Sequence, residues 1–236
     1  MSEAEQTVIT GASRGIGAAI ASTLAAAGHT VVGLSRSGES AAGTGIRCDV
    51  TDEAAVGAAL AGIAERGPIR ALVNNAGVHL TSPAAKLSTQ RYEQVMQLNA
   101  TAVMVLCREA YPYLKAHGAG RIINIGSFFD KLGVPDNVAY CASKAAVAAI
   151  TRCLAVEWAV DGIAVVNLAP GYVETDLNRD YLSRPKVQDF LRGRIPGGRV
   201  GTVDEVARLV KAVLDADVGY LTGETIYMDG GHGMNH

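Results

Sequence analysis

The sequence contains few aromatic residues and no dense cluster of positive charge. Only 5% of its 236 residues are Phe, Trp or Tyr, and 21 Lys and Arg residues face 23 Asp and Glu residues, which gives a formal net charge of -2. Without a block of Lys and Arg, the chain lacks the usual electrostatic basis for binding nucleic acid or an anionic membrane. A small molecule is therefore the expected partner.

Cysteine is scarce as well, and no two cysteines form a C-x-x-C pair. The four cysteines, Cys48, Cys107, Cys141 and Cys153, lie far apart, which predicts reduced thiols in a cytoplasmic protein. No uninterrupted apolar run approaches the length of a membrane span. The acidic N-terminus lacks the basic region that begins a signal peptide, so we expect no export.

Glycine and alternating apolar segments are abundant instead. Short aliphatic or β-branched runs predict strands, and the longer alanine-rich stretches between them predict helices. This alternation is typical of an α/β fold, a doubly wound parallel sheet with helices on both faces, and the length suits a single domain. We predict about seven strands, at 7–10, 30–34, 45–48, 69–73, 121–125, 163–168 and 225–228, and helices at 15–27, 52–66, 89–116, 139–160 and 203–214.

Two segments depart from this alternation. Residues 35–44 are small, polar and Gly-rich, so we expect a loop where a doubly wound sheet normally places a helix. Residues 174–200 are rich in charge, and Pro185 and Pro196 are expected to break regular structure there. We predict that this second segment is a mobile lid over the substrate.

A glycine-rich turn joins the first predicted strand to the first predicted helix. Gly11, Gly15 and Gly17 follow the spacing T-G-x-x-x-G-x-G. Glycines at such a turn allow a tight backbone and let a pyrophosphate approach the free N–H groups of the helix. A purely structural turn is the alternative, but its position at the carboxyl edge of a parallel sheet favours a dinucleotide site.

Together with this turn, several later motifs resemble the short-chain dehydrogenase/reductase family over nearly the whole chain. Each motif alone matches many proteins by accident, whereas their joint order and spacing are specific. The resemblance implies a Rossmann-type fold and a cytoplasmic homotetramer or dimer that uses NADP(H) to interconvert a carbonyl, of ketone or 3-oxoacyl type, and a secondary alcohol. The motifs are Asn74-Asn75-Ala76-Gly77, Asn99, Ser127, Tyr140-Cys-Ala-Ser-Lys144, Pro170-Gly171 and Asp229-Gly230-Gly231.

Four of these residues are candidate catalytic groups. Tyr140 and Lys144 are one helical turn apart, so they share a face and the ammonium can favour the phenolate. Tyr140 would then be the general acid for reduction and the general base for oxidation, although a solvated helix face has the same pattern. Ser127, just past a predicted strand, can hydrogen-bond the carbonyl oxygen. By the resemblance, Lys144 also binds the nicotinamide ribose and Asn99 holds a water that relays protons, unless its amide merely satisfies helix carbonyls.

The end of the second predicted strand bears on cofactor choice. An NAD-specific site usually has an acidic residue there, whereas this chain has Ser35 followed by Arg36. Arg36 and Arg14 can pair with a 2′-phosphate, so we expect NADP(H), although each could be a solvated loop charge. By the resemblance, Asp49 accepts from the adenine amino group and Thr175 fixes the nicotinamide carboxamide. The other expected cofactor contacts are Gly11, Ser13, Gly15, Ile16, Gly17, Val50, Asn75, Ala76, Gly77, Tyr140, Lys144, Pro170, Gly171 and Val173.

The histidines do not form a pattern that would indicate a metal site. The histidines have no metal-ligand spacing, so no metal is expected. We expect His79 in solvent near the site, and His232 and His236 in a mobile tail.

Three residues beside the candidate catalytic groups allow more than one interpretation. Cys141 is a weak candidate nucleophile because no histidine motif accompanies it. Phe128 and Phe129 either wall the substrate site or pack beneath the lid.

Two other functions share this fold. By the resemblance, epimerases, dehydratases and lyases of nucleotide sugars are related, but they usually have longer chains with a C-terminal substrate domain. A non-catalytic NADP(H) sensor is the second alternative, yet such proteins often lack a catalytic residue, and all four matching positions are present here. We therefore favour the carbonyl reductase.

Overall fold

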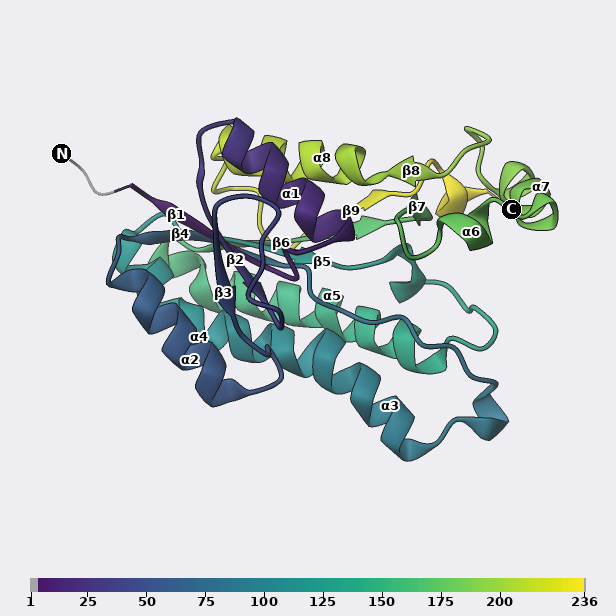
Figure 1. The fold of residues 1–236 in the computed structure, drawn as a ribbon, viewed down its shortest axis with the longest axis horizontal. Helices are drawn as coiled ribbons and strands as arrows, with labels where there is room; N and C mark the ends of the chain where they lie inside the picture. Colours follow the sequence, from purple (N-terminus) through teal and green to yellow (C-terminus); the bar gives the residue numbers. More distant parts are fainter. Residues whose placement is uncertain (1–3, 236) are drawn as a thin grey trace.

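A parallel sheet lies between two layers of helices in the computed structural model, which describes residues 4–235 (Figure 1). The strand order is β3-β2-β1-β4-β5-β6-β9, and every neighbouring pair is parallel. All seven predicted strands are present, and the doubly wound α/β prediction is confirmed. The strands are β1 (Gln6–Thr10), β2 (Thr30–Ser35), β3 (Thr44–Arg47), β4 (Ile69–Asn74), β5 (Arg121–Ile125), β6 (Ala164–Pro170) and β9 (Thr225–Met228).

Two apolar cores fill the spaces between the sheet and the helices. Successive side chains of a strand point to opposite faces, so Val8 packs into one core and Ile9 into the other. Both sides of the central strands are therefore buried, which explains their nearly continuous apolar runs. The helices on one face are α1 (Gly15–Ala26) and α8 (Val203–Ala216), and those on the other are α2 (Glu53–Ala64), α4 (Ala102–His117) and α5 (Val138–Trp158).

The helix predicted over 89–116 is interrupted. It consists of α3 (Thr89–Met96), a π-helical turn at Gln97–Thr101, and α4. Such a turn inserts a residue into the helix without changing its apolar composition, so periodicity does not reveal it. The π-helical turn contains Asn99, which is buried.

The loop expected between the second and third strands is confirmed. No helix intervenes between β2 and β3, and the connecting loop folds back over β2. Its Ala41 N–H donates to the carbonyl of Ala12 at 3.1 Å. A Cβ on Gly33 would lie only 2.6 Å from the Cβ of Ser40 in this loop, so a side chain there would push the loop off the strand.

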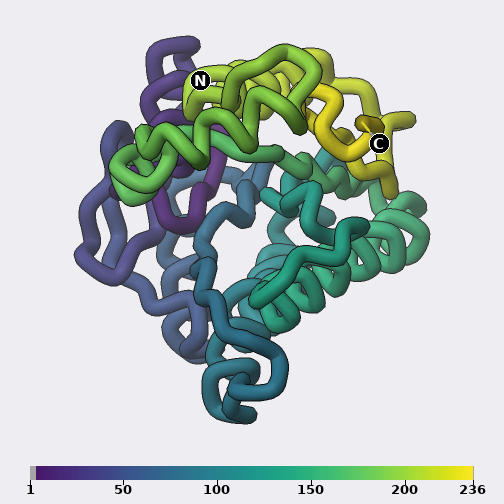
Figure 2. The backbone as a smooth tube through the Cα atoms, turned by 90° about the vertical axis from the view of Figure 1, so that its right-hand side faces the viewer, coloured from purple at the N-terminus to yellow at the C-terminus, as the bar shows by residue number. Residues whose placement is uncertain are grey.

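Residues 174–200 contain more regular structure than expected. Two helices, α6 (Arg179–Leu182) and α7 (Pro185–Arg194), lie within this segment, which is green in Figure 2. The prediction that Pro185 breaks regular structure is wrong, because Pro185 occupies the first turn of α7, where a missing N–H has no helical partner to lose. Short strands β7 (Val173–Glu174) and β8 (Gly201–Thr202) pair with each other and hold the ends of the segment together.

Helix α5 with its short extension is long and apolar enough to cross a membrane, judged by length and composition alone. In the fold it packs against β6, α3 and the turn Phe128–Asp130. Its buried face carries Ser143, Lys144 and Thr151, which are polar. We therefore assign it as a core helix of the domain.

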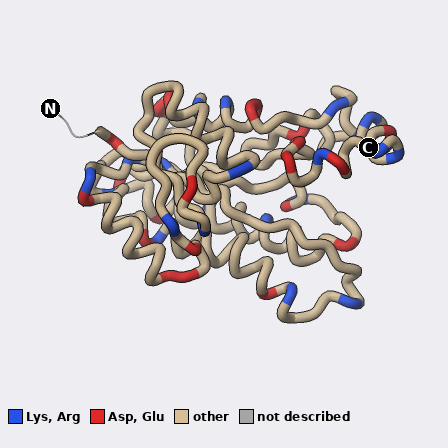
Figure 3. The backbone as a smooth tube through the Cα atoms, in the orientation of Figure 1, with Lys and Arg blue, Asp and Glu red and all other residues tan. Residues whose placement is uncertain are grey.

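Charged side chains of both signs are mixed along the chain (Figure 3). Blue and red segments are interspersed over the helices and loops in this view. This distribution agrees with the small net charge of -2.

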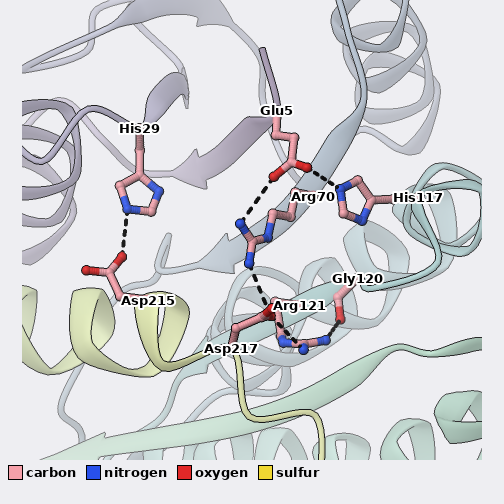
Figure 4. A network of polar contacts seen from close by, with 8 residues as sticks. All are labelled: Glu5, His29, Arg70, His117, Gly120, Arg121, Asp215 and Asp217. Atoms are coloured by element: carbon pink, nitrogen blue, oxygen red, sulfur yellow. Dashed lines mark hydrogen bonds and ion pairs between the residues drawn. The ribbon is translucent and has the colours of Figure 1, made fainter. Parts of the chain in front are cut away.

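A network of ion pairs ties the amino ends of the strands together (Figure 4). Glu5 contacts both Arg70 and His117, each at 3.1 Å, and Asp217 contacts Arg70 at 3.1 Å and Arg121 at 2.9 Å. The side chains of Glu5 and Asp217 are about half exposed, 47% and 51%, so each pair contributes little to stability. The network lies at the edge of the sheet opposite to the carboxyl ends of the strands.

A chain of buried side-chain hydrogen bonds joins β4, β5 and α5. Asn74 Nδ2 donates to Asn124 Oδ1, and Asn124 Nδ2 donates to Thr151 Oγ1, each at 2.9 Å. All three residues are buried and cannot hydrogen-bond to water, so these bonds satisfy their polar groups instead. These contacts fix the position of α5 relative to the central strands.

Replacing Asn124 with Ala tests this chain. The substitution removes the bonds of Asn124 to both neighbours and leaves Asn74 Nδ2 with only the Cys107 thiol and Thr151 Oγ1 with only the Val147 carbonyl, so the free energy of unfolding should fall by about 1–3 kcal/mol. The exposed amide of Gln94 in α3 gives a control, and Gln94→Ala should change stability by less than about 0.5 kcal/mol. Urea denaturation measures both, and equal stabilities of the two variants would contradict the assignment.

Candidate functional site

The glycine turn after β1 has a backbone that only glycine adopts easily. Gly11 and Gly15 have φ of 69° and 57°, in the left-handed region. A Cβ on Gly17 would lie 2.2 Å from the carbonyl oxygen of Gly11, which excludes any side chain. Helix α1 starts there without a side-chain cap on its N–H groups and without an acidic residue in its first turn. Because these N–H groups remain available, the turn fits the pyrophosphate of a dinucleotide.

The Asn-Asn-Ala-Gly segment after β4 is bonded to this turn. Thr10 Oγ1 accepts the N–H groups of Asn75 and Ala76, each at 3.0 Å, and Asn75 Nδ2 donates to the carbonyls of Thr10 and Gly11. Gly77 follows, and a Cβ on it would lie 3.2 Å from Asn99 Oδ1. The structure thus brings the predicted residues Asn75, Ala76 and Gly77 to the glycine turn.

The segment after β6 also returns to the glycine turn. The methyl group of Thr175 lies 3.9 Å from the position that a Cβ on Gly15 would take. Pro170 ends β6, and Gly171 follows where a Cβ would lie 2.7 Å from the Cα of Asp229. Val173 belongs to β7 and is buried. The predicted carboxamide contact, Thr175, is therefore beside the phosphate turn.

At the end of β2, the predicted serine and arginines have different surroundings. Ser35 is buried, and its hydroxyl donates to the carbonyl of Glu39 at 2.7 Å. Arg14 and Arg36 are exposed at the carboxyl edge. The sequence analysis did not single out Arg47, although β3 pairs it in register with Ser35.

Asp49 and Val50 follow β3. Asp49 Oδ1 accepts the N–H of Thr51 at 3.0 Å and its hydroxyl at 2.7 Å, and these bonds, more than the charge of Arg36, lower the pKa of the Asp49 carboxyl. The second carboxylate oxygen remains open to an amino group. Val50 instead packs into the core with Leu34 and Val56.

Lys144 and Tyr140 lie on α5 as predicted; Lys144 is buried and Tyr140 is partly buried. Lys144 is 6% exposed, its Nζ donates to the carbonyl of Ile125 at 2.8 Å, and burial lowers its pKa to about 8. Burial raises the pKa of Tyr140 to about 12, and the neighbouring Ser127 hydroxyl partly offsets this rise. Loss of hydration is the main cause of this rise, and the Lys144 Nζ lies 5.7 Å from the centre of the Tyr140 ring.

Ser127 and Asn99 complete the predicted group of four. Ser127 lies two residues after the end of β5 and is buried, and its Oγ accepts the N–H of Phe129 at 3.3 Å. Asn99 Oδ1 accepts the N–H of Val78, while Nδ2 donates to the carbonyl of Val78 and to Ser143 Oγ. Both amide hydrogens are therefore occupied by these partners, and neither goes to a helix carbonyl.

The aromatic residues beside Ser127 are buried. Phe128 and Phe129 are 2% and 7% exposed, which favours the interpretation that they pack inside the fold. The prediction that His232 lies in a mobile tail is wrong: its ring stacks on Tyr172, with ring centres 5.7 Å apart. Aromatic contacts at the end of the chain could not be deduced from composition alone. His236 lies outside the described residues.

Cys141 and His79 both lie next to Tyr140 in the structure. Burial raises the pKa of the Cys141 thiol, which is the opposite of an activated nucleophile. His79 is exposed as expected, but its ring centre lies 4.5 Å from that of Tyr140. No sequence pattern connects these two positions, which are far apart in the chain.

The geometry defines a class of protein: a dinucleotide-binding α/β enzyme with a tyrosine, a lysine and a serine at the edge where the cofactor binds. Residues 11–233 match the profile of a family described as enoyl-(acyl carrier protein) reductase. The chain is 36% identical over 231 residues to the 3-oxoacyl-[acyl-carrier-protein] reductase MabA of Mycobacterium tuberculosis, covering 97% of this chain and 93% of MabA. It is 35% identical over 239 residues to FabG of Escherichia coli, a reductase of the same name, covering 97% of each.

A solved structure shows the same relationship. A gluconate 5-dehydrogenase from Burkholderia cenocepacia, in complex with NADP and tartrate, superposes with a TM-score of 0.90 at 33% identity, covering 98% of this chain and 96% of that one. The chain belongs to the short-chain dehydrogenase/reductase family. It is an oxidoreductase of carbonyl and alcohol groups, as the sequence predicted.

Replacing Gly17 with Ala tests the phosphate turn. The added Cβ would meet the Gly11 carbonyl, so the turn must open, and loss of one charge-assisted hydrogen bond to a phosphate would weaken dinucleotide binding by about 10-fold or more. Gly62 in α2 has open space around it, so Gly62→Ala serves as the control with unchanged binding. Calorimetric titration with NADPH measures both affinities. Unchanged affinity in a folded Gly17→Ala variant would contradict this role.

Proposed function

We propose that this chain is an NADPH-dependent carbonyl reductase in which Tyr140 is the general acid. The observation that carries the proposal is the meeting of Ser127, Tyr140 and Lys144 at the carboxyl edge that also holds the glycine turn. An epimerase or a non-catalytic sensor of the same fold is less well supported. The matched family and the named relatives are reductases and dehydrogenases.

The proposed mechanism divides the work among these side chains. Bound NADPH supplies the hydride to the carbonyl carbon. Ser127 hydrogen-bonds the carbonyl oxygen, and Tyr140 donates its proton to that oxygen as negative charge develops. Its high pKa, about 12, keeps the proton on Tyr140 until the transfer. Lys144 holds the nicotinamide ribose, and in alcohol oxidation the same steps run in reverse.

The preference for NADP(H) rests on positive charge at the adenosine end. Arg14 and Arg36 flank a position where Ser35 replaces the usual acid, and we add Arg47 as a third charge because it is the register partner of Ser35. The gluconate 5-dehydrogenase solved with NADP supports this choice of cofactor.

We further propose that the substrate is a ketone or a 3-oxoacyl compound and that residues 174–200 act as its lid. MabA and FabG are 3-oxoacyl-carrier-protein reductases, whereas the solved relative acts on gluconate, so both classes deserve direct assay. A panel of acyl thioesters, sugars and cyclic or aryl ketones, followed by NADPH oxidation, tests the proposal. Absence of turnover across the panel, by a protein that binds NADPH, would favour the sensor instead.

The assembly we propose is a cytoplasmic homotetramer. Val156 in α5, Val160 just after it, and Tyr220 are 79%, 89% and 100% exposed, which is unusual for apolar or aromatic side chains and fits burial between subunits. We propose that the long helix at 139–160 and the segment 220–228 pair between subunits, and Val156 and Tyr220 belong to these two segments.

The Tyr140→Phe variant tests the general acid. It keeps the ring but removes the transferable proton, so turnover should fall by about 10²-fold or more while NADPH still binds. Tyr92→Phe, in α3, is the control and should keep the activity of the parent. Steady-state assays of both variants decide the matter, and near-normal turnover by Tyr140→Phe would show that another group supplies the proton.

The Arg36→Ala variant tests cofactor choice. Loss of a charge-assisted contact should raise the KM for NADPH by roughly 10- to 150-fold and leave that for NADH nearly unchanged, because only NADPH carries the phosphate. Arg66→Ala, between α2 and β4, removes an arginine elsewhere and should alter neither value. If the parent enzyme had equal kcat/KM values for NADH and NADPH, or a higher value for NADH, the proposed preference would be refuted.

Light scattering tests the assembly. We expect about four times the 24.5 kDa chain mass at micromolar concentration, and a smaller species for Val156→Glu, because a buried carboxylate without a partner opposes association. A parent protein that is monomeric under these conditions would contradict the tetramer.

A further inference from the structure

His79 touches the proposed general acid, yet the mechanism above gives it no task. Its ring centre lies 4.5 Å from that of Tyr140, and the two planes are tilted by 53°. The ring of Phe129 stands nearly perpendicular to both, 5.9 Å from Tyr140 and 6.3 Å from His79. The three rings therefore form one mutually contacting group around the phenol.

The position of the His79 ring is set by Asn137. Asn137 Nδ2 donates to the carbonyl of Pro135 at 2.7 Å, so its Oδ1 is the atom that faces His79 Nε2, at 2.5 Å. His79 Nε2 must then be the donor of this bond. Asn137 is buried and directly precedes α5, the helix that carries Tyr140. The imidazole is thus fastened to the start of the same helix as the phenol that it contacts.

The backbone around His79 is held as well. Val78, the preceding residue, exchanges two hydrogen bonds with the side chain of Asn99, each at 2.8 Å. A few residues later, the N–H of Ser82 donates to the carbonyl of Asp136 at 2.8 Å. An exposed ring on a freely moving loop could not constrain its neighbour, whereas this one is tied on both sides.

We propose that His79 is a positioning residue for Tyr140: together with Phe129 it confines the Tyr140 ring, so that the phenol hydroxyl stays aligned with the substrate oxygen. The proposal rests on the proposed role of Tyr140 as general acid. Proton donation requires a heavy-atom distance within hydrogen-bond reach, and small misplacements lower rates strongly. The contact of Ser127 with the phenol restrains only the hydroxyl end of the ring, so restraint along its faces must come from neighbouring rings.

A comparison of His79→Ala in two backgrounds tests this inference. In the parent background, kcat should fall by roughly 10-fold, while the dissociation constant for NADPH stays unchanged. In the Tyr140→Phe background there is no phenol proton to align, so the same substitution should change the residual single-turnover rate by less than about 2-fold. His29→Ala is the matched control, since His29 pairs with Asp215 at the opposite edge of the sheet and should leave activity as it is.

The outcomes separate the possibilities. Equal fractional losses in both backgrounds would overturn the proposal and assign His79 to direct substrate contact, and no loss in the parent would overturn it as well. If Tyr140→Phe itself kept full turnover, the general-acid proposal would fail independently of His79. If the Ala variant does not fold, His79→Phe and His79→Gln replace it. His79→Phe retains a ring against Tyr140 and should keep more activity than His79→Gln, and the reverse order would contradict positioning by the ring.

Discussion

The ammonium of Lys144 is buried at the carboxyl edge of the sheet, and among residues 4–235 no carboxylate pairs with it. Its fixed partner is the carbonyl of Ile125 at the end of β5. Loss of hydration disfavours the charged form, which is why its pKa falls to about 8. A buried ammonium without a carboxylate partner lowers the stability of the fold. Such buried charges are commonly found at functional sites, where the charge contributes to binding or catalysis.

The polar groups around Lys144 are held by contacts outside the reaction itself. The bond between Asn124 and Thr151 anchors α5 to β5, and Asn99 ties the Val78 backbone to Ser143, the residue before Lys144. Asn75 likewise holds the glycine turn, because its Nδ2 donates to the carbonyls of Thr10 and Gly11. The amides of Asn99 and Asn124 have protein partners at both oxygen and nitrogen, so these contacts hold the site in place without a ligand. Such preorganisation favours catalysis, because little rearrangement is needed when charge develops on the substrate.

Much of this arrangement could be predicted from the sequence. The strands are short apolar runs with both faces buried, and the glycine spacing and the Tyr-x-x-x-Lys pair are local patterns. They predict a turn at Gly17 and a helix that carries Tyr140 and Lys144, and the structure has both. What the sequence missed depends on contacts between distant segments. The π-helical turn at Asn99 leaves composition unchanged, and the contact of His79 with Tyr140 joins a loop to helix α5, two segments that only the fold brings together. The direction of the Tyr140 pKa shift depends on burial, which a helix pattern does not give.

The pH dependence of kcat/KM for carbonyl reduction by NADPH tests the buried lysine most directly, since it reports ionisations of the free enzyme. In the proposed mechanism Tyr140 must be protonated, and the charged ammonium of Lys144 is the form that donates to the nicotinamide ribose. Tyr140 keeps its proton until about pH 12, so the first loss should come from Lys144. The account predicts a rate that is constant at neutral pH and falls as the pH rises through about 8. A rate that stays constant up to the ordinary lysine pKa of 10.5 would contradict it.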